Sequence, residues 1–393
     1  MWRPSEFAHP GFLLSVAFCL YTLAGYPLLL EILARLKTKP VRKAPARKTV
    51  SVLLPVFNGA AWIGSKLETL LALDYPRDLI EILVVSDGST DATDSIVAGY
   101  AGRGDIRLLR VQHGGKAAAL NRALAEARGE ILFFTDVRQQ LHPESLSNLV
   151  SCFADPTVGA ASGELVILEG TKREESSVGL YWQYEKWIRK RLSRVDSVPG
   201  ATGCIYAVRR ELAVPFPENS LADDMYLPLA AFFRGYRVVF DDSAFAYDHP
   251  TQLSGEFHRK VRTLAGVFQI VGEYPKLLSP ANRMWIHFMS HKVARLLLPY
   301  ALIAMAVSSF GLPAPWAAVA GTAQASFYGL ALADQWISER SPLKRLSSLP
   351  RAFVVLVWAA VCASLILFAP GQVLWKETQV SPLGSVKPAK SGN

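Results

Sequence analysis

The chain of 393 residues is poor in cysteine, and its four cysteines show no metal-binding spacing. Cys19 and Cys362 lie within apolar segments, while Cys152 and Cys204 lie in the part predicted to be cytoplasmic, so disulfides are not expected. Four histidines of the C-terminal half also lack zinc-binding spacing: His249, His258, His287 and His291. These absences argue against a disulfide framework and against a zinc centre.

Positive charge is nearly absent before the first apolar segment, where only Arg3 occurs. This segment runs from Gly11 to about Leu33 and is long enough to cross a bilayer of ~30 Å. A cleaved signal peptide would carry its charge before the apolar stretch, so the pattern predicts an anchor. Basic residues follow it directly: Arg35, Lys37, Lys39, Arg42, Lys43, Arg47 and Lys48. Their position places the N-terminus outside and the following chain in the cytoplasm.

Apolar residues make up 51% of the chain, and their excess lies at the two ends. Further spans are predicted at about 296–312, 315–332 and 353–368, which with the first segment gives a multi-pass protein. Basic residues before the last span indicate a cytoplasmic loop: Arg340, Lys344, Arg345 and Arg351. Four spans leave the tail outside, but the Trp375-Lys376-Glu377 stretch suits an interfacial anchor on either side. A final segment that re-enters, breaking at Pro370-Gly371, remains an alternative.

The net charge of +9 permits two interpretations, nucleic acid or anionic lipid. Because the basic clusters flank apolar spans, lipid headgroups are the better partner and no nucleic acid is expected. The aromatic and basic stretch Tyr181–Lys190 is likewise interpreted as an amphipathic helix at the headgroup level rather than a base-stacking surface.

Between Thr49 and about Pro250, short β-rich runs alternate with helical stretches. Strands are predicted at 50–54, 80–85, 106–111 and 131–134, and helices at 61–73, 91–101 and 116–127. This alternation predicts a parallel sheet with helices on both faces, whose ligands bind at the carboxyl ends of the strands. The predicted units are an anchor and basic linker (1–48), a catalytic domain (49–250), amphipathic interfacial helices (251–292), membrane helices (293–375) and a flexible tail (376–393).

Polar residues follow four of the predicted strands in order, and it is this order that carries the signal. They are Pro55 and Asn58, then Asp87, then His113-Gly114-Gly115-Lys116, then Asp136. Glycines let a ligand approach the backbone closely, and a neighbouring lysine can meet a phosphate as a point charge. Asp87 is suited to accept hydrogen bonds from a base or ribose. Alone, each motif is equally typical of an ordinary turn or helix cap.

The segments Val50-Ser-Val-Leu-Leu-Pro-Val-Phe-Asn, Ser86-Asp-Gly-Ser-Thr-Asp, Gly115-Lys-Ala-Ala-Ala-Leu-Asn and Phe134-Thr-Asp resemble the family 2 membrane glycosyltransferases. Three further segments extend the match to about Arg295: Gly200-Ala-Thr-Gly-Cys-Ile-Tyr-Ala-Val-Arg-Arg, Ala222-Asp-Asp and Arg259-Lys-Val-Arg-Thr-Leu-Ala-Gly. The resemblance implies a GT-A fold, an α/β architecture with a Rossmann-like mixed sheet. It also implies inverting transfer from a nucleotide-activated sugar.

The resemblance also implies roles for individual residues. Asp87 would bind the base, Lys116 would lie near base and diphosphate, and Asp136 would be the first acid of an Asp-x-Asp metal motif. Asp224 would be the catalytic base and Arg262 would steady the departing diphosphate. Asp223 is placed beside the base as support, although acids also favour the start of a helix. The remaining residues assigned to the nucleotide-sugar site are Pro55, Asn58, Asn121 and Arg259.

Two departures from the family pattern affect the expected chemistry. Arg138 replaces the second acid of the metal motif, and arginine cannot ligate a metal. Either Mg²⁺ or Mn²⁺ is held by Asp136, the diphosphate and waters, or Arg138 itself supplies positive charge. In the processive synthases the Gln-x-x-Arg-Trp motif ends in an acceptor-holding tryptophan; here Arg259 replaces the glutamine and Thr263 the tryptophan. The loss of this aromatic platform argues against processive polymerisation without excluding it.

The sequence therefore predicts an inner-membrane glycosyltransferase that uses a nucleotide sugar, with a UDP-sugar favoured. The expected acceptor is a polyprenyl-linked glycan or a growing exopolysaccharide. A processive synthase is one alternative, and would need an oligomer or partner because four spans are few for a channel. An inactive nucleotide-sugar-binding scaffold is the other, although such a scaffold has no use for a catalytic base.

Overall fold

We analysed a computed structural model that describes residues 4–168, 173–249, 253–338 and 341–367. Several expectations concern residues outside the described ranges and therefore stay predictions. They are the domain boundary at 250, the basic residue Arg340, the break at 370–371, the anchor at 375–377 and the tail at 376–393.

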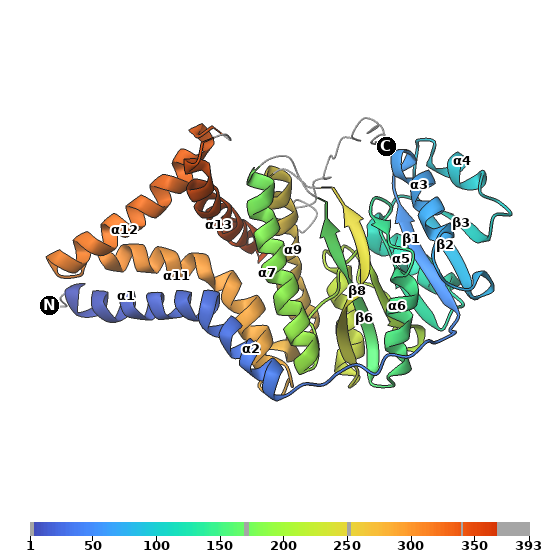
Figure 1. Cartoon of the computed structure of the whole chain (residues 1–393), viewed down its shortest axis with the longest axis horizontal. Helices are drawn as coiled ribbons and strands as arrows, with labels where there is room; N and C mark the ends of the chain where they lie inside the picture. Colours follow the sequence, from blue (N-terminus) through green and yellow to red (C-terminus); the bar gives the residue numbers. More distant parts are fainter. Residues whose placement is uncertain (1–3, 169–172, 250–252, 339–340, 368–393) are drawn as a thin grey trace, which may run out of the picture.

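A mixed eight-stranded sheet forms the centre of the sheet domain in the described residues (Figure 1). Its strand order is β3-β2-β1-β4-β7-β6-β8-β5. β1 to β4 run parallel, β7 lies antiparallel to both β4 and β6, and β8 pairs parallel with β6. The strands are β1 Val50–Val56, β2 Ile80–Asp87, β3 Asp105–Val111, β4 Ile131–Phe134, β5 Gln140–Leu141, β6 Val158–Ile167, β7 Tyr206–Arg209 and β8 Arg237–Asp248. The predicted GT-A-like mixed sheet is confirmed.

Helices cover both faces of this sheet, as predicted. Successive residues of β1 enter different apolar cores, Leu53 on one face and Val52 and Leu54 on the other. This alternation explains why the strand reads as a continuous apolar run. The helices of the domain are α3 Ala60–Leu71, α4 Thr93–Ala98, α5 Gly115–Glu126, α6 Ser145–Ser151 and α8 Asp223–Phe233.

The helix predicted at 91–101 is shorter than expected. Asp91 precedes α4 and its carboxylate accepts a hydrogen bond from the backbone N–H of Thr93, at 3.0 Å. Such local bonds favour helix starts over helix interiors. Gly99 then follows the last helical residue, so the predicted helix was too long at both ends.

A helical arm joins the sheet through two long helices, α7 (Arg173–Val195) and α9 (Leu253–Glu273), which lie between the two parts in Figure 1. The arm consists of α1 Pro4–Leu20, α2 Tyr26–Leu36, α10 Trp285–Phe288, α11 Ala294–Ser309, α12 Ala314–Ala333 and α13 Leu343–Ser364. α1 lies beside α11, so the first and later apolar segments form one bundle.

Among the described residues, three helical stretches are long and apolar enough to cross a membrane: His9–Leu36, Trp285–Ser309 and Leu346–Leu367. The segment predicted at 315–332 forms α12, but this helix is not one of the three. It mixes Thr322 and Gln324 with small residues, which lowers its hydropathy. Three of the four predicted spans thus overlap candidate stretches, and the span at 315–332 stays a prediction.

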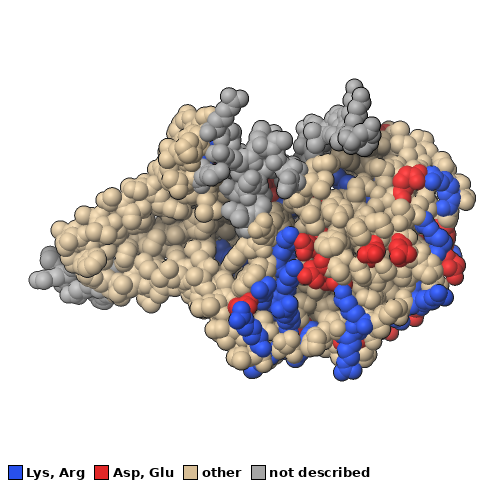
Figure 2. Space-filling model, viewed as in Figure 1, with Lys and Arg blue, Asp and Glu red and all other residues tan. Residues whose placement is uncertain are grey.

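The surface of the arm is mostly apolar. Leu14, Val307, Phe310 and Val319 each expose more than 60% of their surface. In the face shown in Figure 2, acidic and basic side chains gather over the sheet domain, and the arm is almost free of them. An apolar surface of this extent is suited to lipid or to a partner rather than to water.

A junction centred on Asp196 connects the arm to the sheet. Its carboxylate binds Lys39 Nζ at 2.8 Å and Arg283 Nε at 3.1 Å. Arg237, in β8, donates to the backbone carbonyls of Lys39, Ser193 and Asp196. The linker after α2, the end of α7, β8 and the segment before α10 are thereby held together.

Candidate active site

The turn after β1 is bound to the turn after β2. Asn58, in the left-handed region with φ of 46°, accepts a hydrogen bond from the Thr90 N–H at 2.8 Å and donates its own N–H to Ser89 Oγ. Gly88 has a φ of 71°, and a Cβ at this position would lie 2.9 Å from the His113 nitrogen. A side chain at position 88 would therefore push apart the loops that follow β2 and β3.

Asp87 holds the loop that begins α5. Its buried carboxylate accepts the backbone N–H groups of Gly114 at 2.8 Å and Gly115 at 2.9 Å. A negative charge at this helix start also complements the helix dipole. The sequence-based hypothesis has Asp87 bind the base directly. In the structure its carboxylate binds the backbone of the loop that begins α5, and its role toward a base stays a prediction.

An aromatic pair lies beside this loop and was not anticipated. The Phe57 and His113 rings lie 4.3 Å apart between centroids, and both are partly exposed. Phe57 stands between Pro55 and Asn58, so an aromatic residue directly after a strand was the available signal. The pair offers a flat surface against which a planar ring can stack.

Lys116 connects acids from two different elements. Its Nζ lies 3.0 Å from Asp136 Oδ1, just after β4, and 3.0 Å from Asp223 Oδ2, at the start of α8. Burial alone would lower the pKa of Lys116, but the two carboxylates outweigh burial and raise this pKa well above its ordinary value. The lysine is thus fully charged, and the structure brings together three residues that the sequence placed about 20 and 87 positions apart.

Asp224 lies next to this bridge. Burial, followed by the charge of Asp223, raises the pKa of Asp224 to about 6, while Lys116 and Arg189 oppose the rise. Its backbone carbonyl accepts the Ala201 N–H at 2.7 Å, which fixes the first turn of α8. A carboxylate with this pKa is ionised at neutral pH and is still basic enough to take a proton.

The segment around Gly203 makes room at this carboxylate. A Cβ at Gly203 would lie 3.5 Å from Asp224 Oδ2, so the glycine leaves one side of the carboxylate open. Next to it, Thr202 accepts a hydrogen bond from Arg189 at 2.7 Å, which brings a cation from α7 to the same region. The motif beginning at Gly200 therefore packs against the proposed base.

Arg138 does not add its charge to the acids of the site. Its guanidinium lies 2.6 Å from Asp248 Oδ2, at the end of β8, and the Gln139 amide donates to the same oxygen at 2.8 Å. Of the two possibilities raised by the sequence, this arrangement favours a metal held by Asp136 over a direct role for Arg138.

The donor set fits a divalent cation that arrives with phosphate ligands. No group of three His, Cys, Asp or Glu side chains suited to a metal occurs in the part of the chain that the structure describes. Two carboxylates, those of Asp136 and Asp223, nevertheless converge on one positive charge, the Lys116 ammonium, which acts as a stand-in cation. Magnesium is often bound by one or two carboxylates together with substrate phosphates.

Lys66 supports the turn that carries Asp136. Its side chain is fully buried, and Nζ donates to Thr135 Oγ1 at 2.7 Å and to the Gln139 carbonyl at 2.6 Å. Burial lowers the pKa of Lys66 to about 7. Sequence reasoning missed this residue, because a lysine in an amphipathic helix ordinarily faces water.

Two further predicted residues, Arg259 and Asn121, make the contacts described next, outside the group formed by Lys116 and its two acids. Arg259, on α9, forms an ion pair with Glu256 and lies over the Trp182 ring, 4.5 Å from its centroid. Arg262 is half-buried one turn farther along α9. Asn121 is not brought to the site: its amide binds the backbone N–H and carbonyl of Phe216.

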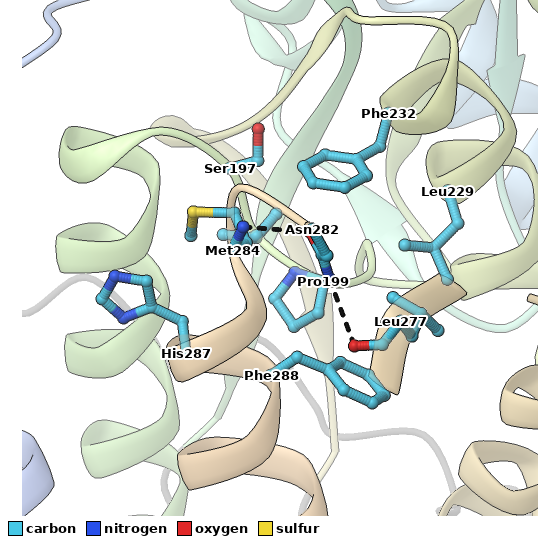
Figure 3. A pocket seen from close by; sticks show the side chains of 10 residues that line it. Ser197, Pro199, Leu229, Phe232, Leu277, Asn282, Met284, His287 and Phe288 are labelled. Atoms are coloured by element: carbon cyan, nitrogen blue, oxygen red, sulfur yellow. Dashed lines mark hydrogen bonds between the residues drawn. The ribbon is translucent and has the colours of Figure 1, made fainter. Parts of the chain in front are cut away.

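A small apolar pocket lies where the sheet domain meets the arm (Figure 3). Its lining includes Leu229 and Phe232 of α8 and Phe288 of α10. Asn282 closes one side through hydrogen bonds with the Leu277 carbonyl and the Met284 N–H. No acidic residue lines it, so it is separate from the polar site at the start of α8.

Two family profiles match the chain. The profile described as Glycosyl transferase family 2 matches residues 51–214, and the one described as Glycosyl transferase family group 2 matches residues 137–367. The chain is similar to the probable glycosyltransferase YdaM of Bacillus subtilis, with 25% identity over 51% of this chain and 50% of the relative. It is also similar to the beta-monoglucosyldiacylglycerol synthase of Synechocystis sp., with 23% identity over 65% of this chain and 56% of the relative. The chain thus spans about half the length of these curated relatives.

Among solved structures, the mannosyltransferase PcManGT of Pyrobaculum calidifontis, in complex with GDP-Man and Mn²⁺, is similar along nearly its whole length. The TM-score is 0.68 and the identity 26%, over 89% of this chain and 99% of that one. The likeness includes the helical arm as well as the sheet, because it covers more of the chain than the sheet domain alone.

Proposed function

Because the chain belongs to glycosyl transferase family 2, we propose that it moves a sugar, with inversion, from a nucleotide-sugar donor to a hydroxyl group of a membrane-associated acceptor. The observation that carries this proposal is the convergence of Lys116, Asp136 and the Asp223–Asp224 pair at the carboxyl ends of the parallel strands. In open α/β sheets this edge is where ligands bind.

In the proposed reaction Asp224 takes the proton of the acceptor hydroxyl. The oxygen forms a bond to the anomeric carbon as the bond to the donor phosphate breaks, and the nucleotide diphosphate leaves. Lys116 contributes a permanent positive charge to the diphosphate region, and Arg262 is proposed to steady the leaving group. A divalent cation held by Asp136 would neutralise developing charge on the diphosphate.

Several observations support a location at a membrane. The three candidate spans and the exposed apolar surface of the arm are suited to lipid. The basic segment between α2 and β1 supports a cytoplasmic catalytic domain at the inner membrane. The name of the Synechocystis relative refers to a glycolipid product, which supports a lipid acceptor; a polyprenyl-linked glycan or exopolysaccharide remains the acceptor proposed from the sequence.

Turnover of a donor panel by the full chain in lipid nanodiscs tests this proposal. The panel contains UDP-sugars, favoured by the sequence, and GDP-mannose, because the similar mannosyltransferase holds GDP-Man. Diacylglycerol and extracted polyprenyl lipids serve as acceptors, with and without Mg²⁺ or Mn²⁺. Release of nucleotide diphosphate that requires an acceptor supports the transferase.

The products of the same assay separate the alternatives. Long chains built on one acceptor would favour a processive synthase over single addition. Donor binding without turnover, for every acceptor and metal, would favour an inactive scaffold and contradict the transferase.

A further inference from the structure

The acids around Lys116 are arranged as a cation site. We propose that Asp136 and Asp223 together bind the divalent cation, and that Lys116 fills this position until the cation arrives with the nucleotide diphosphate. The inference rests on the proposed function for the identity of the ligand, and it adds Asp223 as a metal ligand and Lys116 as a displaceable placeholder.

The distances support exchange of one cation for another. Both carboxylate oxygens lie 3.0 Å from Nζ, whereas Mg²⁺ binds carboxylate oxygens at about 2.1 Å. Each oxygen therefore needs to move by roughly 1 Å, which a side-chain rotation provides. Lys116 ends in a flexible four-carbon stem, so its ammonium can withdraw while its backbone stays in α5.

The site is open to the ligand that would complete it. Asp136 exposes 37% of its side chain and Lys116 27%, while Asp223 exposes 15%. Lys116 directly follows Gly115, whose N–H binds Asp87 at the end of β2, so the site adjoins the Asp87-bound loop. A diphosphate entering there would supply oxygen ligands to the cation and an anionic partner to the displaced ammonium.

A metal ion that binds without the nucleotide diphosphate would have neither the phosphate oxygen ligands nor an anionic partner for the displaced Lys116 ammonium. It would have to break two ion pairs of Lys116 and leave that ammonium without a partner in a partly buried site. Two carboxylates also give fewer ligands than the six that Mg²⁺ requires. Position 138 supplies no third carboxylate ligand, because it is an arginine whose side chain is bound to Asp248. The metal should therefore bind weakly to the free enzyme and tightly together with the nucleotide.

Binding of Mn²⁺ to the full chain in nanodiscs tests this order, because free Mn²⁺ is quantified by electron paramagnetic resonance without any turnover. For the wild type we expect weak binding of Mn²⁺ alone, and affinity at least about tenfold higher with UDP or GDP present. For Lys116→Met, which removes the placeholder charge, we expect Mn²⁺ alone to bind about tenfold more tightly than to the wild type.

Matched variants separate the site from general charge effects. Arg122→Met removes one cation from the exposed face of the same helix, where Arg122 pairs with Glu126, and should leave Mn²⁺ binding unchanged. Adding Asp223→Asn to Lys116→Met should cancel the gain in affinity. If the double variant keeps that gain, Asp223 is not a ligand and the proposal is overturned.

The wild type alone also decides the question if Lys116→Met does not fold. Mn²⁺ affinity that is equally high with and without nucleoside diphosphate would overturn the placeholder role. A protein that shows the expected Mn²⁺ order but never transfers a sugar would leave this inference standing and refute the proposed function, so the two failures are distinguishable.

Discussion

Arg138 Nη2 and Asp248 Oδ2 lie 2.6 Å apart and join the turn after β4 to the end of β8. The acidic partner of Arg138 is therefore in the framework of the sheet, although position 138 is the one at which the family motif would have its second metal acid. Gln139 strengthens the same contact from the neighbouring position. A change at position 138 thus affects the shape of the turn before it affects the charge of the site.

Arg138→Asp restores the family pattern in sequence and should nevertheless impair the protein. The new carboxylate would face the buried Asp248, so we expect no gain in Mn²⁺ affinity and a loss of roughly 3 kcal/mol in unfolding free energy. Manganese titration and thermal unfolding of the same preparation measure both effects. Tighter Mn²⁺ binding in this variant would show that the turn can be rebuilt around a second acid. Arg128→Asp, a charge reversal at an exposed position elsewhere, serves as the control.

Asp224→Asn should abolish transfer while leaving donor binding intact. The amide keeps the shape of the side chain but cannot take a proton, so we expect kcat to fall by at least about 10³-fold. Nucleotide affinity, measured by calorimetry, should change less than about threefold. Asp242→Asn is the matched control, because Asp242 is an exposed acid that pairs with Lys190. Retained turnover in Asp224→Asn would assign the base to another residue.

Asp87→Asn should weaken nucleotide binding by loosening the start of α5. One of the two oxygens becomes a donor that faces a backbone N–H of Gly114 or Gly115. We expect a loss of about 2 kcal/mol in stability and about tenfold in nucleotide affinity. Asp105→Asn, at the exposed opposite end of the parallel strands, should change neither quantity. Unchanged nucleotide affinity in Asp87→Asn would remove this loop from the nucleotide site.

The buried Lys66 predicts a dependence of stability on pH. The pKa of Lys66 is about 7 in the folded protein, whereas the ordinary value of 10.5 applies to the unfolded chain. Between pH 7 and pH 10.5 the unfolded chain therefore binds more protons than the folded protein. The contribution of Lys66 to the free energy of unfolding therefore rises as pH increases from 7 toward 10. Thermal unfolding of the wild type and Lys66→Met over this range should show a Tm difference that shifts in favour of the wild type. A difference that does not change with pH would show that Lys66 stays charged when buried.

The sequence was sufficient for the fold and for placing several acids at the ends of strands, for a physical reason; the roles of these acids stay predictions. Buried parallel strands require continuous apolar runs, and the residues that end them must meet at one edge, so Asp136 could be placed without coordinates. The order of the polar residues after the strands predicted where Asp136 lies. The long apolar stretches predicted the helices of the arm.

The contacts that connect these acids could not be predicted in the same way. The ion pairs of Lys116 and Arg138 depend on which partner lies closest in space, and Asp248 is more than 100 residues from Arg138. The burial of Lys66 reverses the usual preference of lysine for water. For α12, composition suggested a span, but the helix contains polar residues and is not among the three candidate stretches.

The junction at Asp196 has a consequence for which acceptors can react. Lys39 comes from the linker after the first apolar segment and Arg283 from just before the second candidate span, and both bind one carboxylate. Tilting the sheet away from the arm would separate at least one of these charges from its partner. If the arm lies in lipid, as proposed, this junction holds the sheet domain and its Asp224 at a fixed distance from the bilayer. We then expect transfer to favour acceptors whose hydroxyl group reaches that distance, in addition to any preference for their chemical identity.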